Sequence, residues 1–318
     1  MTSMQEVSNE TVVRLSTDKN AVPFETIDYV NYSITMFAWG TSWYALKLQV
    51  GVVAPEVSLV WRFGLAALIM WGWMALSGQR LRFPARDHVR FLMMGILLFS
   101  TNFALFYYGS RVLPSGLLSV VFSLASIINL FLAWLLMGQK ISRRVLLAGL
   151  LGFSGVALMF WPQIAGSGFD QKVLVGIGLC IAGTLCFCVG NLISATNQAR
   201  GLPVIASNGW GMTYGFAFMA FIALVRGHEF IIDQSPEYLV GLIWLAVFSS
   251  VMAFASYLTL LGRIGSARAG YLTVMFPLVA LAISTVFEGY EWTPHAIVGV
   301  GFVLFGNLLV LRAQRPGS

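Results

Sequence analysis

The chain has 318 residues, of which 58% are hydrophobic and only 10% are charged, and its mean hydropathy is +0.80. Because soluble domains carry about 25% charged residues, this composition excludes a soluble globular protein and predicts an all-α integral membrane protein. The formal net charge of +6 does not indicate nucleic-acid binding, because the cations are distributed over short loops and form no single basic face.

Residues 1–28 form a polar segment in which both signs of charge are mixed. A signal peptide would begin with basic residues, continue with a short apolar stretch and end at a small-residue cleavage site, and this segment has no such pattern. We therefore expect residues 1–28 to be a cytoplasmic tail.

Ten apolar runs follow the tail, each close to the length of about 20 residues that a helix needs to cross the hydrocarbon core. They cover approximately residues 29–49, 56–77, 88–109, 113–137, 142–160, 173–198, 203–226, 238–262, 267–287 and 293–312. Strands of a membrane barrel would be about ten residues long with strict alternation. The runs therefore predict ten transmembrane helices, joined by short connections that contain Pro and Gly.

The Lys and Arg residues predict the orientation of these helices. With the N-terminus inside, the inner segments hold 14 of the 19 cations and the outer segments hold 3. The excess of cations in cytoplasmic segments is the pattern expected for inner loops. We expect a multi-pass protein of the bacterial cytoplasmic (inner) membrane with both termini in the cytoplasm.

An internal repeat becomes visible when the sequence is displaced against itself by 151 residues. Residues 115–142 then lie on residues 266–293 without a gap, and Gly138 meets Gly289. The front parts of the two halves match less well. This register predicts that the fourth and fifth helices resemble the ninth and tenth.

The chain thus divides into two five-helix repeats, residues 29–160 and 173–312. Because five is an odd number, the second repeat would be inverted relative to the first. Inverted repeats around a central cavity are typical of secondary transporters. An old duplication in a membrane scaffold or in an enzyme is the alternative.

Four motifs resemble those of the drug/metabolite transporter superfamily, in its ten-helix EamA-type branch. They are "FAWGTSWYALK" in the first run, "PEVSLVWRFGLAALI" in the second, and "LLMGQKIS" and "FEGYEWT" after the fourth and ninth. Within this branch the chain looks most like the aromatic amino-acid exporters. The resemblance implies export of amino acids or related metabolites through a central cavity, and it implies no cofactor.

The chain departs from the family pattern at three positions. Ser126 stands where the family has a proline in the fourth helix, whereas Pro277 matches the corresponding proline in the ninth. Gln139 and Tyr290 stand where the family has glutamates. No role is therefore carried over for carboxylates at these two positions.

Arg62 is a cation within the second apolar run. A charge at the centre of a bilayer costs about 2.5–3.5 kcal/mol on insertion scales. Two interpretations stay open: the guanidinium fixes helix packing by snorkelling or by binding carbonyl groups, or it faces a cavity and binds a substrate carboxylate. In neither case should Arg62 face lipid.

Polar and deeply placed aromatic side chains supply the other candidates for substrate binding. Hydrogen bonds between helices would explain the polar ones equally well, and aromatic residues at span ends also form interfacial belts. With Arg62, the candidates are Trp39, Tyr44, Asn102, Tyr107, Ser123, Ser126, Asn191, Trp210, Tyr214, Tyr257 and Tyr271.

Charged residues near the outer ends of the spans are candidate gates. These are Lys47, Glu56 and Glu288, and we expect Lys47 to extend toward Glu56 as a weak surface pair. Pro277 breaks the hydrogen-bond ladder of the ninth run, which either permits a kink or frees a carbonyl for substrate.

The sequence contains no phosphate-binding loop and no zinc-protease motif, its three histidines are dispersed, and its three cysteines lie in one apolar run. We expect no metal site and no cofactor, and facilitated diffusion or exchange rather than proton coupling. The expected partners are a small-molecule substrate and the lipid bilayer. An intramembrane enzyme acting on a lipid is the alternative function, and a monomer is compatible with the sequence.

Overall fold

A computed structural model describes residues 24–137, 143–161, 171–269 and 272–313 of the chain. All regular structure in these residues is helical. The candidate residue Tyr271, and Gln139, which stands where the family has a glutamate, lie outside the described residues.

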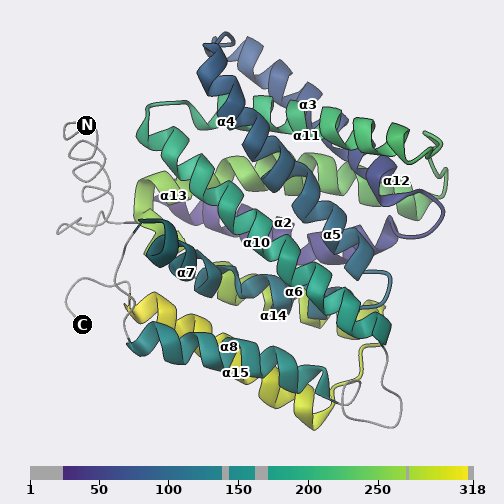
Figure 1. Ribbon diagram of the computed structural model, residues 1–318, viewed down its shortest axis with the longest axis vertical. Coiled ribbons are helices and arrows are strands. Elements are labelled where there is room, and N and C mark those ends of the chain that lie inside the picture. The colour runs from purple at the N-terminus through teal and green to yellow at the C-terminus, as the bar shows by residue number, and fades with distance from the viewer. Residues whose placement is uncertain (1–23, 138–142, 162–170, 270–271, 314–318) are drawn as a thin grey trace.

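The helices of the first half begin and end close to the predicted apolar runs (Figure 1). They are α2 (Thr26–Leu48), α3 (Pro55–Leu76), α4 (Ala85–Ile96), η1 (Leu97–Thr101), α5 (Asn102–Gly109), α6 (Ser115–Ser123), α7 (Ala125–Met137) and α8 (Arg143–Met159). The segments α4, η1 and α5 are continuous, and α6 and α7 are separated at Leu124.

The second half has a similar order of elements. They are α10 (Gln171–Ala199), α11 (Val204–Val225), α12 (Pro236–Ile243), η2 (Trp244–Met252), α13 (Ala253–Ala269), α14 (Leu272–Phe287) and α15 (Pro294–Ala313). Helix α14 continues through Pro277. Within the described residues, six helical stretches are long and apolar enough to cross a membrane, so the chain is an all-helical integral membrane protein.

Local sequence signals explain several helix ends. Glu25 and Asp28 form a reciprocal capping arrangement at the start of α2, and such an arrangement satisfies otherwise free backbone N–H groups. Pro55 and Pro236 occupy the first turns of α3 and α12, where a missing N–H costs nothing. Gly201 follows α10 with a φ of +75°, a conformation that terminates helices and favours glycine.

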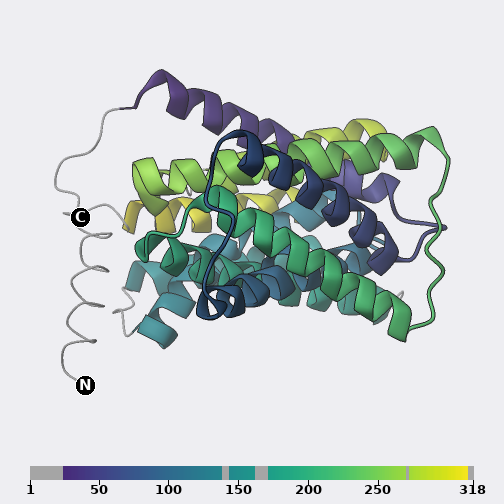
Figure 2. The same cartoon turned by 90° about the horizontal axis from the view of Figure 1, so that it is seen from above.

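The helices lie side by side in one bundle (Figures 1 and 2). Helix α8 packs along α15 at one edge of the bundle, and α11 packs against α3 and α4 at the opposite edge. Between these edges, α2 contacts both α13 and α14. Helix α2 begins and α15 ends on the same side of the bundle.

Two π-helical segments, η1 and η2, interrupt otherwise α-helical stretches. The 151-residue displacement found in the sequence places residues 97–101 on residues 248–252, which belong to η2. Segments of π-helix are rare and occur frequently at functional sites. The two segments therefore mark the regions of the bundle where a site is to be sought.

Candidate functional site

A small cavity lies between α2, α3, α5 and η2, with α6, α10, α13 and α14 each contributing one phenylalanine to its walls. Its volume is about 30 Å³, which holds only about one or two water molecules. Its walls are formed by Trp39, Ser42, Trp43, Leu46, Arg62, Asn102, Phe103, Phe106, Phe122, Phe187, Leu245, Ser249, Phe254 and Phe276. The cavity thus combines aromatic walls with a few polar groups, which is the usual composition of a small-molecule site.

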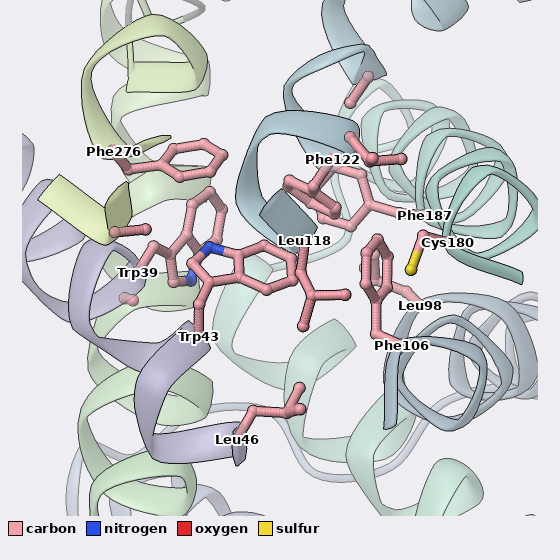
Figure 3. Close-up of a cluster of buried hydrophobic side chains, with 14 of the residues drawn as sticks. Trp39, Trp43, Leu46, Leu98, Phe106, Leu118, Phe122, Cys180, Phe187 and Phe276 are labelled. Carbon is pink, nitrogen blue, oxygen red and sulfur yellow. The ribbon is translucent and has the colours of Figure 1, made fainter. Parts of the chain in front are cut away.

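Trp43 occupies the centre of the aromatic cluster (Figure 3). Its ring centroid lies 5.1 Å from that of Phe106 and 5.3 Å from that of Phe122. Trp39, one helical turn earlier, contacts Phe254 at 5.3 Å and Phe276 at 6.3 Å. Edge-to-face and tilted ring pairs of this kind are favourable, and here they close the space between the two halves of the chain.

Arg62 reaches this cavity from α3 and is 1% exposed. Its Nε donates to the hydroxyl of Ser250 at 3.0 Å, and one terminal nitrogen lies 3.4 Å from the hydroxyl of Ser249. The guanidinium carbon also lies 4.2 Å from the ring centre of Phe103, within cation–π range. The expectation that Arg62 does not face lipid is confirmed.

The charge of Arg62 has no carboxylate partner among the described residues. Its other terminal nitrogen, Nη1, is buried and has no hydrogen-bond partner. A buried charge is normally paired, because removing it from water costs several kcal/mol. The arrangement can therefore accept an anion at Nη1.

Asn102 contributes a second free polar atom to the cavity. The residue directly follows η1, and its side-chain Nδ2 donates to the carbonyl of Leu98 at 3.1 Å. Its Oδ1 is buried without a partner. An unpaired buried polar atom costs about 1–3 kcal/mol, so a ligand that donates to Oδ1 would be stabilised.

The η2 segment organises one wall of the site. It carries Ser249 and Ser250, whose hydroxyls hold Arg62, and the carbonyl of Ser249 accepts the indole N–H of Trp39 at 3.4 Å. Because a π-helix widens the backbone and changes its hydrogen-bond pattern, consecutive side chains can be directed at neighbouring helices. These serine contacts link residues separated by 187 and 188 positions in sequence.

Tyr107 lies beside the cavity and not in its wall. Its hydroxyl donates to Gln49 at 2.6 Å, and Gln49 has a buried side-chain nitrogen without a partner. Tyr107 also interacts electrostatically with Arg62, so it belongs to the polar surroundings of the guanidinium.

Ser123 and Ser126 form a packing contact with α15. Both hydroxyls contact the side chain of Asn307, which donates to Ser123 at 3.1 Å and accepts from Ser126. The network spans the break between α6 and α7. It gives these serines a structural role near the break, which the sequence-based alternative of hydrogen bonding between helices anticipated.

The remaining candidates occupy other places in the bundle. Trp210 and Tyr214 stack on each other beside His88, and Trp210 donates to the carbonyl of Leu81. Tyr44 contacts Phe287. These three candidates do not line the cavity.

Two more candidates are buried close to the core. Tyr257 packs on Trp39 with 4.8 Å between ring centres, behind the cavity wall. Asn191 on α10 has a buried Oδ1 without a partner, yet it is not part of the lining. Of the two asparagines suggested by the sequence, only Asn102 lines the same cavity as Arg62.

Sequence reasoning missed Trp43, Ser42, Phe103, Phe106, Phe122, Phe187 and Phe276 as parts of the site. A signal was available for some of them. Trp43 follows the candidate Trp39 by four positions, and Phe106 follows Asn102 by four, so each pair shares one helix face.

The three candidate gates all make polar contacts. Glu56 binds Arg226 and accepts from Tyr108 at 2.8 Å. Lys47 donates to the carbonyl of Ser110, and the expectation that it extends to Glu56 is therefore wrong. Lysine reaches an unpaired carbonyl here because the helix end leaves it free.

Glu288 joins the end of α14 to the start of α6, where it accepts from the backbone and hydroxyl of Ser115. A carboxylate at a helix N-terminus is favourable because free N–H groups and the helix dipole attract it. This contact connects the two halves at the end of the bundle opposite to the start of α2.

At the other end of the bundle, Arg263 from α13 binds Asp28 and Glu25 at the start of α2, each at 2.7 Å. Both carboxylates precede the predicted first span. The hydrogen bonds from Arg263 hold the pKa of the Asp28 carboxyl below its ordinary value. This contact also joins the two halves, and the sequence did not suggest it.

No group of three His, Cys, Asp or Glu residues within the described part of the chain is placed to hold a metal ion. The cavity lining contains no acidic residue and no histidine. The chemistry that the lining offers is reversible binding of an anionic or zwitterionic molecule with an apolar part.

The sequence matches the EamA-like transporter family twice, over residues 29–161 and 170–312. A protein of Archaeoglobus fulgidus described as an uncharacterized transporter is 22% identical, over 90% of this chain and 99% of its own length. Protein PagO of Salmonella typhimurium is also 22% identical, over 89% and 92% of the two chains. One crystal structure covers 93% of this chain and all of its own chain, with a TM-score of 0.67 and 16% identity.

Proposed function

We propose that this chain, which belongs to the EamA-like transporter family, is a secondary transporter that exports amino acids, aromatic ones included, or related small metabolites across the cytoplasmic membrane. The observation that carries the substrate class is the free Nη1 of the buried Arg62. Transport as such agrees with the names of several relatives.

The argument for a carboxylate substrate begins with the charge of Arg62. A fixed protein carboxylate would neutralise the guanidinium permanently and occupy its free nitrogen. A substrate carboxylate can supply the same charge-assisted hydrogen bond and then leave, as a transport cycle requires. The serine hydroxyls of Ser249 and Ser250 hold the guanidinium in place but leave its charge uncompensated.

The aromatic walls support a substrate with an apolar side chain. Trp39, Trp43 and Phe276 offer ring faces and edges within one cavity, and such surfaces favour apolar and aromatic groups. The cavity of about 30 Å³ is too small for an amino acid, so the proposal requires the cavity to widen when substrate binds. Substrate entry requires the rings to separate as the halves move.

Alternating access between the two halves is the proposed mechanism. The family matches residues 29–161 and 170–312 separately, and η1 and η2 occupy related positions in these regions. Both features support two inverted five-helix repeats that rock around the cavity. The start of α2 and the end of α15 lie on one side of the bundle, which agrees with two termini on the same side of the membrane, and the distribution of cations favours the cytoplasmic side.

We propose that transport is facilitated diffusion or exchange and is not coupled to a proton gradient. Carriers that couple to protons usually place ionisable groups in the substrate pathway. The lining offers the guanidinium of Arg62 and no carboxyl or imidazole group, and an arginine stays protonated at physiological pH. The pH gradient should therefore have little direct effect on substrate binding.

The test is counterflow in proteoliposomes that are preloaded with unlabelled amino acid, measured with and without a pH gradient. We expect uptake of labelled phenylalanine or tryptophan that does not depend on the gradient, and loss of this uptake in Arg62→Ala. Ser119→Ala is a matched control, because Ser119 is buried and bonds only a carbonyl of its own helix. Absence of flux for every amino acid in the native protein would overturn the proposed substrate.

A further inference from the structure

Three residues that line the cavity each carry one buried polar atom without a partner. These atoms are Nη1 of Arg62, Nε1 of Trp43 and Oδ1 of Asn102. The first two are hydrogen-bond donors and the third is an acceptor. Polar groups buried in proteins are nearly always paired, so three unpaired atoms around one cavity indicate a ligand with matching groups.

The orientation of the Asn102 amide follows from its neighbour. The side chain lies 3.1 Å from the carbonyl oxygen of Leu98, which can only accept a hydrogen bond. The amide nitrogen must therefore face Leu98, and Oδ1 must be the atom that remains free. The free acceptor of Asn102 is thus a consequence of hydrogen-bond chemistry and not of an arbitrary amide assignment.

We infer that Asn102 is the specificity-determining residue for the ammonium group of an α-amino acid, and that Trp43 and Arg62 together hold its carboxylate. This inference rests on the proposed function. A carboxylate accepts from two donors, which Nη1 of Arg62 and Nε1 of Trp43 supply. The ammonium group needs an acceptor, which Oδ1 of Asn102 supplies.

A neutral amide suits this role better than a carboxylate would. An aspartate at this position would compensate the charge of Arg62 from within the protein and compete with the substrate carboxylate. The zwitterionic head of an amino acid brings its own negative charge, so its ammonium group needs only a dipole. The site therefore favours zwitterions over amines, which lack the anion for Arg62.

The specificity rule separates three probes with the same aromatic ring. Phenylalanine has both head groups, 3-phenylpropionate has only the carboxylate, and 2-phenylethylamine has only the ammonium group. Hydrogen bonds to charged groups contribute about 1.5–3 kcal/mol, so loss of the ammonium contact should weaken binding about tenfold to a hundredfold. The amine should bind still more weakly because it also faces an uncompensated guanidinium.

The experiment measures inhibition of phenylalanine counterflow in proteoliposomes by each probe. For the native protein we expect phenylalanine to inhibit at least tenfold more strongly than 3-phenylpropionate. In Asn102→Leu, which removes the acceptor and keeps the side-chain size, this ratio should approach one. In Trp43→Phe, inhibition by phenylalanine and by 3-phenylpropionate should weaken equally, because both probes lose a hydrogen bond to their carboxylate. The ratio of the two inhibition strengths should therefore stay as in the native protein.

Asn191→Leu is the matched control, because Asn191 also has a buried unpaired Oδ1 but lies outside the lining; its ratio should be native. A native protein that carries phenylalanine yet binds 3-phenylpropionate equally well overturns the inference and leaves the proposed function intact. If Asn102→Leu keeps the native ratio between phenylalanine and 3-phenylpropionate, the inference is likewise overturned and the proposed function stays intact. A native protein without amino-acid flux overturns the proposed function itself.

Discussion

Ser249 and Ser250 position the guanidinium of Arg62 through hydroxyl contacts from the η2 segment. Neither serine needs to touch the substrate for this purpose. Their effect arises because a flexible arginine side chain loses less entropy on binding when its orientation is already set. At the scale of single residues, the site thus depends on an arginine and on the two neutral side chains that direct it.

Ser250→Ala should weaken substrate binding without abolishing transport. It removes the 3.0 Å hydrogen bond to Nε of Arg62, and hydrogen bonds to charged groups contribute about 1.5–3 kcal/mol. The half-saturating concentration in counterflow should therefore rise about tenfold or more, while the maximal rate changes little.

Thr259→Val is a suitable control for this variant, because the Thr259 hydroxyl bonds a carbonyl of its own helix α13. It should leave the half-saturating concentration unchanged. An unchanged value in Ser250→Ala as well would show that η2 does not position Arg62.

At the scale of helices, α8 and α15 approach each other through glycine. A Cβ atom on Gly299 would lie 2.5 Å from the carbonyl oxygen of Gly155 and 2.4 Å from a side-chain atom of Met159. Small residues permit such close backbone approach between membrane helices. This pair forms one edge of the bundle (Figure 1).

Gly299→Ala should destabilise the protein, because the backbone of α8 must move to admit the methyl group. Overpacking of this kind costs typically about 1–3 kcal/mol. Gly301→Ala on the same helix is the matched control, since a Cβ atom there meets nothing within 4 Å. Thermal unfolding in detergent should show a lower midpoint for Gly299→Ala only, and equal midpoints would contradict the close packing of these helices.

At the start of α2, its contact with α13 is an ion pair between Asp28 and Arg263. Arg263 lowers the pKa of the Asp28 carboxyl from its ordinary value of 3.8, so the folded state favours the charged form. The resulting stabilisation is present above the ordinary pKa and is lost as the pH falls through the lower pKa of the folded protein.

The midpoint of thermal unfolding should therefore be higher for the native protein than for Asp28→Asn at neutral pH. The difference should shrink below about pH 4, where Asp28 becomes protonated in the unfolded and then in the folded state. Glu25→Gln is the control, because Glu25 is largely exposed and exposed pairs contribute little. A difference that persists unchanged at pH 2 would show that the charge of Asp28 is not responsible.

At the scale of the whole molecule, polar contacts join the two halves at both ends of the bundle, and a small cavity of about 30 Å³ lies between the halves. Glu288 with Ser115 and Glu56 with Arg226 lie at one end, and Arg263 with Asp28 lies at the other. The alternating access proposed above requires one set of these contacts to break while the other holds.

The predicted orientation can be tested with single cysteines in a background without Cys180, Cys186 and Cys188. An impermeant thiol reagent should label Gln234→Cys from outside intact cells. Ser77→Cys should react only after the membrane is permeabilised, because the cations after the second run place that loop inside. Both positions are exposed, and the reversed labelling pattern would show the opposite orientation.

The sequence by itself determined the membrane class and the positions of the helices. Hydropathy and helix ends are local properties, since about 20 consecutive apolar residues must satisfy the bilayer wherever they pack. The helix ends near Pro55, Gly201 and Pro236 follow from the same local chemistry. Arg62 and Asn102 were also recognisable, because polar residues inside apolar runs need partners.

Only the tertiary structure decided what these residues meet. Arg62 contacts serines almost 190 positions away, Glu56 pairs with Arg226 in place of Lys47, and Asn102 reaches the cavity while Asn191 does not. The π-helical segments likewise have no local sequence signal. The physical reason is that a burial requirement is encoded in each segment, whereas the identity of a partner depends on how all the segments pack.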